Sequence, residues 1–548
     1  MRKNLPHILM LAIFLPALTL VYGQVSQGGQ PYSLYANLKS AHELPLIDIT
    51  PPKNTDLPEE NAQDRALYRV AIGNEVDIEL SRDGHWESIP GEGRVCRLNI
   101  RSAGAKAIHI FFEEYALPEG GELFIYNKDQ SRILGAYTAS NNRPSGKLAI
   151  QAIPGEEICI EYFEPEGADF PAVLRIGNIG HNYRENILYD VSGFGDSQKC
   201  NKDINCTQAA DWQTEKRAVC KILYKKNNDN YYLCTGALIN NARNDGSPYF
   251  LTANHCVSSN TEAESIVLYF NYESPTCNGP EGSDKQTVSG SSILATTYRL
   301  DFSLVELSEK PPLSYEPWYA GWDARDQPPD KVVTIHHPAG DVKKISSFTK
   351  SPVTGDFTYL YDYDDSTHWY INDWTLGITE GGSSGSPLFN SKGQIVGDLT
   401  GGSSVSNCTS SDAYYAKFSD SWADYTNLTT HLKPWLDPDS TGVMAIEGYD
   451  PLVPSGVEDF EAKDFNAGLQ FEVYPNPAGD YLNIKSKNRT VSGYTVELLD
   501  LSGKLIRRKQ VDNQRAEVRM QVSSFQNGFY LLRITYGDSV TIKKLIIL

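Results

Sequence analysis

Short runs of alternating apolar and polar residues, separated by turn-forming residues, make up the first third of the chain. The clearest runs are KAIHIFF at 106–112, ELFIY at 122–126 and EICIEYF at 157–163, with Gly, Pro and Asn between them. Alternation of this kind is typical of half-buried β-strands, and the region shows no long helical period. The pattern predicts a β-sandwich over residues 24–194.

A second β pattern lies near the C-terminus, in the runs FEVY at 471–474, YTVELL at 494–499 and TIKKLIIL at 541–548. Residues 449–468 combine Pro and Gly with acidic side chains, which is typical of a linker. The middle of the chain holds the Gly/Ser-rich segments and most of the cysteines. We therefore expect five parts: a leader at 1–23, the sandwich at 24–194, a middle domain at 195–448, a linker at 449–468 and a C-terminal β domain at 469–548.

The leader has the pattern of a secretory signal peptide. A basic start, Met1–Asn4, is followed by an apolar stretch from Ile8 to Leu20 and by the small-residue site before Gln24. The apolar stretch is too short for a membrane span. Export from the cytoplasm makes disulfides plausible in the mature chain.

Composition limits the classes of function. The chain has 548 residues, enough for three or four domains of about 150 residues each. With 69 Asp and Glu against 49 Lys and Arg, its net charge is −20, which argues against a nucleic-acid partner. Nine cysteines is an odd number, so at least one thiol is unpaired within the chain. Cys96 and Cys159 are the two cysteines of the predicted sandwich and form a candidate disulfide.

Three motifs in the middle domain carry candidate chemistry: LTANHC at 251–256, DFSLVEL at 301–307 and GGSSGSP at 381–387. They supply His255, Asp301 and Ser384 in that order. A Ser hydroxyl needs a neighbouring base before it acts as a nucleophile, and His has a suitable pKa for this role. A buried Asp fixes the tautomer of the imidazole and stabilises its protonated form. The motifs therefore predict a Ser-His-Asp catalytic triad.

Glycines around Ser384 allow backbone N–H groups to face the developing oxyanion of the reaction. The expected donors are the amides of Gly382 and Ser384.

Residues 195–448 resemble the chymotrypsin-fold serine proteases, and most closely the bacterial lysyl endopeptidases. The resemblance rests on CTGALINN at 234–241, YFLTANHC at 249–256, FNYESPTC at 270–277, YAGWDARDQ at 319–327, IHHP at 335–338, GSSGSP at 382–387 and WLDPDSTG at 435–442. It implies two six-stranded β-barrels with the triad between them and a C-terminal helix near Leu428–Leu436. The expected fold is thus mainly β, a double barrel flanked by two β-sandwich domains.

The resemblance also implies three disulfides, Cys200–Cys408, Cys206–Cys277 and Cys234–Cys256. Cys220 is left over, at a position where the family pattern supplies no cysteine. We expect it to be buried and inert, since a reactive exposed thiol would be a liability outside the cell.

The resemblance indicates a preference for cleavage after Lys. Ile378 stands six residues before the nucleophile, where trypsin-like proteases carry an acidic selector, and it cannot pair with a cation. The lysyl endopeptidases carry their selecting carboxylate in a Ser-Asp-x-Tyr segment that matches Asp412. A compact Lys ammonium on its long stem suits such a carboxylate better than the planar Arg fork.

The segment 400–402 (TGG) resembles the strand that forms the wall of the specificity pocket, so Thr400, Gly401 and Gly402 are candidate substrate-binding residues. Thr400 departs from the family, whose members have His there. Two alternatives to Lys specificity remain: a protease of the same fold with Arg/Lys or Glu preference, and a non-catalytic surface-binding protein with a relic triad.

A second departure concerns activation. Ser383 precedes the nucleophile where chymotrypsin relatives have Asp, so we expect a new N-terminus to find no buried carboxylate. Activation should then rest on removal of residues 24–194, whose position favours a propeptide, with a stable accessory domain as the alternative. Gly195 matches the start of the mature family members, and Arg184 and Lys199 are nearby basic sites for processing.

The C-terminal β domain resembles the sorting domain of the type IX secretion pathway of Bacteroidota, with a generic adhesive sandwich as the alternative. The matching segments are FEVYPNPA at 471–478, DLSGK at 500–504 and NGFYLL at 527–532. The resemblance implies transport across the outer membrane by the type IX machinery, followed by release or surface attachment. We expect a monomer that acts on peptide substrates without a cofactor. We also expect no metal site, because the acidic run Asp362, Asp364 and Asp365 lacks the ligand spacing of a calcium loop and the resemblance makes His336 and His337 structural.

Overall fold

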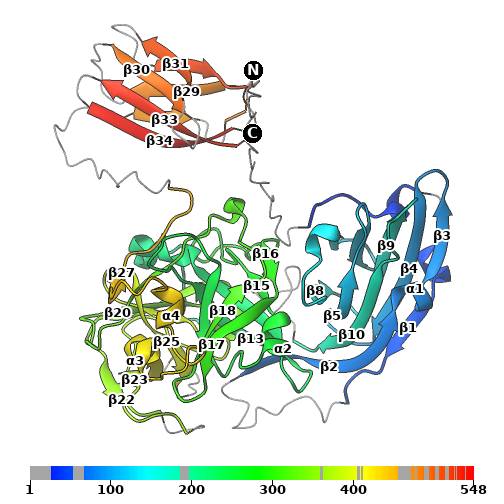
Figure 1. Ribbon diagram of the computed structural model, residues 1–548, viewed down its shortest axis with the longest axis horizontal. Helices are drawn as coiled ribbons and strands as arrows, with labels where there is room; N and C mark the ends of the chain where they lie inside the picture. The colour runs from blue at the N-terminus through cyan, green and yellow to red at the C-terminus, as the bar shows by residue number, and fades with distance from the viewer. Residues whose placement is uncertain are drawn as a thin grey trace, which may run out of the picture. The chain divides into compact units, whose positions relative to one another are not determined.

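A computed structural model represents the protein (Figure 1). It describes residues 26–53 except 37, 67–184, 197–453 except 358–361, 404–407 and 409–411, and, nearer the C-terminus, 471–474, 478–479, 481–486, 493–499, 505–511, 517–523, 525 and 528–547 except 537–538. The predicted signal peptide, Gly195 and most of the predicted linker lie outside these residues. The chain divides into two compact units, Met1–Pro451 and Leu452–Leu548.

The sandwich expected near the N-terminus packs two β-layers around one apolar core. One layer has the order β1-β4-β9-β6-β7, with β3 paired to β4, and the other has the order β2-β10-β5-β8. Leu98 and Ile160 of the first layer meet Ile110 and Ile176 of the second in this core. The strands are β1 Leu46–Ile49, β2 Tyr68–Glu79, β3 His85–Ile89, β4 Gly93–Ser102, β5 Ala107–Ala116, β6 Glu122–Asn127, β7 Ile133–Tyr137, β8 Leu148–Pro154, β9 Glu157–Pro165 and β10 Val173–Asn182.

Cys96 and Cys159 do not form the expected disulfide, because both are buried free thiols. β4 and β9 pair so that Cys96 lies opposite Tyr162, whereas Cys159 lies opposite Asn99. Residues 96 and 99 are three positions apart on one strand, so their side chains point to opposite faces of the sheet. Cys96 lies in the core between the layers and Cys159 in a separate cluster. The prediction was wrong because a count of cysteines carries no information about strand register.

The first barrel contains seven named strands: β12 Val219–Lys225, β13 Tyr231–Leu238, β14 Tyr249–Ala253, β15 Val267–Tyr269, β16 Thr287–Ser289, β17 Ser291–Thr297 and β18 Phe302–Leu307. They pair in the order β16-β15-β12-β13-β14-β18-β17. Only Gly290, at φ +70°, separates β16 from β17. Because these two strands form one bent run, the pairing returns on itself and the sheet is barrel-like.

The sandwich and the first barrel share a sheet and a core. β2 pairs antiparallel with β13, with Tyr68 opposite Leu233. Apolar side chains from both sides, including Phe111 of the sandwich and Tyr269 of the barrel, form one buried cluster. The sequence patterns did not predict this junction, since strand pairing between distant segments leaves no local signal.

The second barrel contains β11 Lys202–Asp203, β19 Gly321–Asp323, β20 Val332–His336, β21 Lys344–Phe348, β22 Val353–Gly355, β23 His368–Ile371, β24 Pro387–Phe389, β25 Gln394–Gly401, β26 Ala413–Lys417 and β27 Ala445–Ile446. Its main order is β11-β21-β20-β24-β25-β26-β23-β22. A bridge between Ser347 and Leu376 joins β21 to the segment after β23. The expected mainly β fold with barrel-like sheets is confirmed.

The α-helices of the described residues are short: α1 Leu80–Asp83, α2 Asn260–Glu264, α3 Phe418–Ala423 and α4 Lys433–Leu436. The helix expected near Leu428–Leu436 is therefore confined to the last four of these positions. Pro434 lies in its first turn, where the missing N–H of proline is tolerated. Within the described part of the chain, no helix has the length and apolarity needed to cross a membrane.

The second unit is a small β domain with its own core. Two sheets, β28-β29-β32 and β31-β30-β33-β34, enclose buried side chains such as Leu482, Val496 and Leu532. The strands are β28 Phe471–Tyr474, β29 Tyr481–Ser486, β30 Tyr494–Leu499, β31 Leu505–Val511, β32 Glu517–Gln521, β33 Gly528–Tyr536 and β34 Ser539–Ile547.

Candidate active site

The register of two neighbouring strands brings His255 and Asp301 together. β14 pairs with β18 so that Ala253 lies opposite Phe302, and the two candidate residues follow and precede these positions. His255 Nδ1 lies 2.8 Å from Asp301 Oδ2, and the backbone N–H of His255 donates to Asp301 Oδ1 at 3.0 Å. Both residues are buried. This geometry fixes the orientation of the imidazole and leaves its Nε2 on the other side of the ring.

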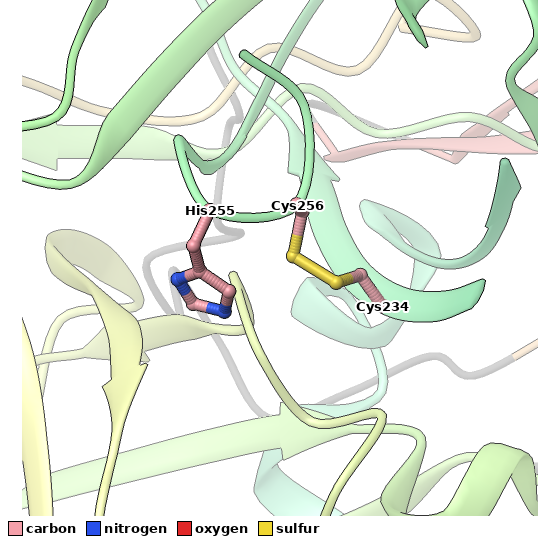
Figure 2. Close-up of side chains that lie close together, drawn as sticks. All are labelled: Cys234, His255 and Cys256. Carbon is pink, nitrogen blue, oxygen red and sulfur yellow. A yellow bond between two sulfur atoms is a disulfide. The ribbon is translucent and has the colours of Figure 1, made fainter. Parts of the chain in front are cut away.

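Thr235 of β13 binds the backbone of the loop that carries Ser384. The N–H of Thr235 donates to the carbonyl oxygen of Ser384 at 2.8 Å, and its Oγ1 donates to that of Gly382, also at 2.8 Å. Cys234, the residue before Thr235, forms a disulfide with Cys256, the residue after His255 (Figure 2). The hydrogen bonds of Thr235 and the Cys234–Cys256 disulfide together connect the Ser384 loop to the His255 loop. Among the described residues, His255 Nε2 has no hydrogen-bond partner, although it is buried.

The loop around Ser384 needs glycine at two positions. Gly382 has φ +92° and Gly385 has φ +78°, in the region that side chains rarely adopt. A Cβ at Gly382 would lie 2.9 Å from the carbonyl oxygen of His337. The N–H of Ala339 donates to the carbonyl of Gly381 at 2.7 Å, so the loop at 337–341 supports the backbone beside the predicted oxyanion donors.

His336 contacts the loop that carries Ser384. Its Nδ1 lies 2.8 Å from Ser383 Oγ and its Nε2 lies 3.1 Å from Ser346 Oγ. Burial lowers the pKa of His336 to about 3, so the ring is neutral near pH 7. His337 Nδ1 lies 3.0 Å from the carbonyl of Asp341. The motif alone did not predict these contacts.

Cys234, His255 and Cys256 have ligand atoms within 4.8 Å of one another, a spacing compatible with a metal ion. The two sulfur atoms share a disulfide, however, so neither is a thiolate. This cluster therefore has no donor set for a metal.

The candidate substrate-binding residues lie where β25 ends and β26 begins. Gly401 lies opposite Tyr414, and a Cβ on Gly402 would lie 2.1 Å from the carbonyl oxygen of Asp412. Asp412 Oδ1 accepts the backbone N–H of Ser403 at 2.5 Å. The structure therefore brings the proposed selector beside the two glycines.

Thr400 is bonded to a histidine that the sequence patterns did not single out. His368 Nε2 lies 3.1 Å from Thr400 Oγ1. Burial lowers the pKa of His368 to about 4, so this ring is also neutral near pH 7. Phe357, Tyr363 and Tyr414 form an aromatic cluster beside it. The position at which the resemblance implies His is thus Thr400, and an imidazole from β23 lies beside it.

Asp398, two residues before Thr400, is a buried carboxyl that sequence reasoning missed. It is 2% exposed, and its Oδ2 has no hydrogen-bond partner among the described residues. Burial, and secondarily the charge of Asp301, raises its pKa well above the usual range. This shift favours the protonated, uncharged form of Asp398 in the folded protein. A signal was present in the sequence, since an Asp inside an apolar strand run is unusual.

Three disulfides are present: Cys200–Cys408, Cys206–Cys277 and Cys234–Cys256. These are the three pairs that the resemblance implies. Cys220 is a buried free thiol, as expected. Burial raises its pKa to about 12, which keeps it protonated and unreactive.

Two acidic side chains near the Ser384 loop, the buried Asp341 and the half-buried Glu380, contact the segment that begins at Ser197. Asp341 Oδ2 accepts the Oγ–H of Ser197 at 2.5 Å, and Glu380 Oε1 accepts the N–H of Gln198 at 2.9 Å. The expectation that a new N-terminus finds no buried carboxylate stays a prediction, because Gly195 lies outside the described residues.

Two known families match separate segments of the chain, and a curated relative aligns over most of it. Residues 194–416 match the family described as lysyl endopeptidase, C-terminal domain. Residues 472–548 match the secretion system C-terminal sorting domain. A lysyl endopeptidase of Pseudomonas aeruginosa is 28% identical over 427 residues, covering 74% of this chain and 82% of that protein.

Two solved structures are also similar. The thermostable serine protease AL20 from an extremophilic microorganism is 13% identical, with 37% of this chain and 92% of that chain covered and a TM-score of 0.28. A Glu endopeptidase in complex with MPD is 18% identical, with 41% and 93% covered and a TM-score of 0.25. The sequence matches carry the conclusion: the protein is a serine endopeptidase that resembles the bacterial lysyl endopeptidases and ends in a type IX secretion sorting domain.

Proposed function

We propose that the protein hydrolyses peptide bonds after Lys, with His255, Asp301 and Ser384 as its catalytic triad. The observation that carries the triad is the His255–Asp301 contact at 2.8 Å together with the unpartnered Nε2 of the same ring. An imidazole that is fixed at Nδ1 and open at Nε2 is prepared to accept a proton from a serine hydroxyl.

The reaction follows from this geometry. Ser384 Oγ attacks the scissile carbonyl carbon while its proton passes to His255 Nε2, and Asp301 stabilises the resulting imidazolium. The amides of Gly382 and Ser384 hold the oxyanion. His255 then donates the proton to the leaving amine. Water, activated by the same imidazole, hydrolyses the acyl-enzyme and restores Ser384.

Asp412 is the proposed selector for Lys. It lies beside Gly401 and Gly402, the candidate wall of the specificity pocket, because β25 and β26 approach each other closely at these glycines. A negative carboxylate there favours a cationic P1 residue and opposes Glu. The lysyl endopeptidase of Pseudomonas aeruginosa supports Lys as the cation.

The residues 24–194 are the proposed propeptide, and they reach the nucleophile loop. A Cβ at Gly381 would lie 3.1 Å from the ring of Tyr68, at the start of β2. The guanidinium of Arg184 stacks on that ring at 4.4 Å. Removal of the sandwich is therefore the proposed activation step, with cleavage between Arg184 and Lys199.

The export route is proposed from both ends of the chain. Residues 1–23 direct transport across the inner membrane, and the sorting domain directs transport across the outer membrane of a Bacteroidota-type bacterium. Deletion of 469–548 should leave the protease in the periplasm, which fractionation of the host would detect.

Digestion of an unbiased peptide mixture tests the proposed activity. The wild type should cut after Lys, and Ser384→Ala should not cut. Asp412→Asn should lose most of the Lys preference, whereas Asp330→Asn, which neutralises an exposed loop carboxylate, should keep it. Cuts after Glu would contradict the role of Asp412. No cleavage by the processed wild type would favour a non-catalytic surface protein.

A further inference from the structure

The segment Ser197–Asn201 connects loops that lie far from it in sequence. It contains the first described residues of the protease part of the chain. Its side chains and backbone contact the loop at 337–341, the stretch before Ser384 and the loop that leads to Asp412. We call it the clasp segment. Its contacts with these three loops include hydrogen bonds and one disulfide, which are directional.

Asn201 makes the central contacts of the clasp segment. Its Nδ2 donates to Glu380 Oε1 at 2.6 Å, and its Oδ1 accepts the backbone N–H of Ile378 at 3.0 Å. Asn201 is 8% exposed. One amide side chain thus binds both Ile378 and Glu380, in the stretch that leads to Ser384.

Glu380, which Asn201 holds in place, is in turn hydrogen-bonded to the loop that carries Ser384. Its backbone N–H donates to Ser383 Oγ at 3.2 Å, and its carbonyl accepts the N–H of Ser383 at 2.9 Å. Ser383 is the residue before Ser384. Two hydrogen bonds therefore separate Asn201 from the backbone that carries the nucleophile and the predicted oxyanion donors.

The rest of the clasp segment holds the neighbouring loops. Gln198 Oε1 accepts the N–H of Cys408 at 2.6 Å, and Cys200 forms a disulfide with Cys408. Cys408 lies four residues before Asp412. Ser197 donates to Asp341 Oδ2 at 2.5 Å, in the loop whose Ala339 supports Gly381. The nucleophile loop and the selector loop therefore share one anchor.

We propose that Asn201 is a positioning residue of the protease, which sets the backbone of residues 378–384 for catalysis without a free terminal amine. The proposal rests on the proposed role of Ser384 as nucleophile. All of these contacts are made by internal side chains and peptide groups, so they are present in the uncleaved chain. Cleavage of the junction then activates the enzyme by removing the sandwich, and it is not needed to assemble the nucleophile loop.

A misplacement of about 1 Å in a catalytic loop costs about 10²-fold in rate. Asn201→Ala should therefore lower kcat/KM on a Lys substrate by about 10²-fold, mainly through kcat. It should also slow inactivation by a fluorophosphonate, a small probe that reacts with the nucleophile and requires no P1 residue. Both rates are measured on the full chain after processing.

Asn205→Ala is the matched control. Asn205 lies four residues later and also uses both ends of its amide, with Nδ2 donating to the carbonyl of Ser274 and Oδ1 accepting from Lys216. These hydrogen bonds join Asn205 to segments other than the nucleophile loop. Its loss should change the fluorophosphonate rate by less than about threefold, the expectation for an ordinary context effect. Melting temperatures of both variants show whether they are equally folded.

A charge swap separates positioning from general stability. Asn201→Asp alone places a carboxylate against Glu380 and should be inactive or poorly folded. Combined with Glu380→Gln, the new Asp accepts hydrogen bonds from Ile378 and from the new amide, while the bond from the Gln198 N–H to Glu380 Oε1 is lost, so the double variant should recover part of the activity that Asn201→Asp loses. The swap needs no assumption about how well the alanine variant folds.

The outcomes are distinct. Recovery in the double variant, with a selective loss in Asn201→Ala, supports positioning. Equal losses in Asn201→Ala and Asn205→Ala, or no recovery in the double variant, overturn it. A wild type that is labelled at Ser384 but cuts after Glu contradicts the proposed Lys specificity and leaves this test intact. A wild type that is not labelled at Ser384 overturns both proposals.

Discussion

His255 and Asp301 come from paired strands of the first barrel, whereas Ser384 lies on a loop of the second barrel that distant residues hold in place. The first pair is set by the register of β14 and β18, which also places many apolar side chains in the core. The loop of Ser384 and the residues before it are held by one or two hydrogen bonds each from Thr235, Ala339 and Asn201. Pairing of two strands rests on many backbone hydrogen bonds, so it survives most side-chain substitutions. A contact made by one polar side chain is lost when a single atom is removed. The two sides of the site should therefore respond differently to mutation.

The largest effect is expected on the strand-paired side. Asp301→Asn keeps the shape of the side chain but stabilises the wrong imidazole tautomer and removes the charge that balances the imidazolium. The loss in kcat should be about 10⁴-fold, with little change in melting temperature. Steady-state kinetics on a Lys ester would measure it. A loss below tenfold would show that another residue supports His255.

On the loop side, Gly382→Ala is the sharpest single change. The new Cβ would meet the carbonyl of His337 at 2.9 Å and would be strained at φ +92°. The loop must move, so the oxyanion donors are displaced and kcat should fall by about 10²–10³-fold. Gly479→Ala, at a position in the second unit where a Cβ meets nothing within 4 Å, is the control. Equal activity of both variants would contradict the role of this backbone.

The Cys234–Cys256 disulfide, which connects the His255 side of the site to the Ser384 side, can be removed by mutation. Replacement of both Cys234 and Cys256 by Ala removes a disulfide that spans 22 residues. The expected loss of stability is about 3 kcal/mol from the loop that it closes. Activity should fall with temperature sooner than in the wild type, because Thr235 and His255 then lose their shared anchor. Urea unfolding measures the change, and an unaltered midpoint would contradict it.

The sequence motifs predicted the strand-paired side better than the loop side. His255, Asp301 and Ser384 each lie in a local motif, and the resemblance implied all three disulfides. Asn201 and Glu380 are 179 residues apart, and neither belongs to a local pattern that marks their contact. The pairing of β2 with β13 was missed for the same reason. Cys96 and Cys159 show the reverse error, since a plausible pair on neighbouring strands faces opposite sides of one sheet.

The smallest expected effect is a pH dependence of stability from Asp398. Its pKa is raised in the folded protein, so at low pH both states hold the proton and folding has no cost from this group. As the pH rises above about 4, the usual pKa of Asp, the unfolded state releases its proton while the folded state keeps it. Folding therefore becomes less favourable, by at most about 1.4 kcal/mol for each pH unit, until the folded pKa is reached.

Asp398→Asn keeps the shape and does not titrate, so it should be more stable than the wild type at pH 7 and nearly equal to it at pH 4. Urea unfolding at pH 4, 5.5 and 7 gives the two curves. Asp203→Asn is the contrasting control, because Asp203 is buried too but pairs with Lys344 at 2.6 Å, and its loss should destabilise the protein at pH 7. Parallel curves for Asp398→Asn and the wild type would mean that Asp398 is charged in the folded state. In that case the second barrel would hold a buried carboxylate whose charge repels that of Asp301. This repulsion would destabilise the loop side of the site even with all its hydrogen bonds formed.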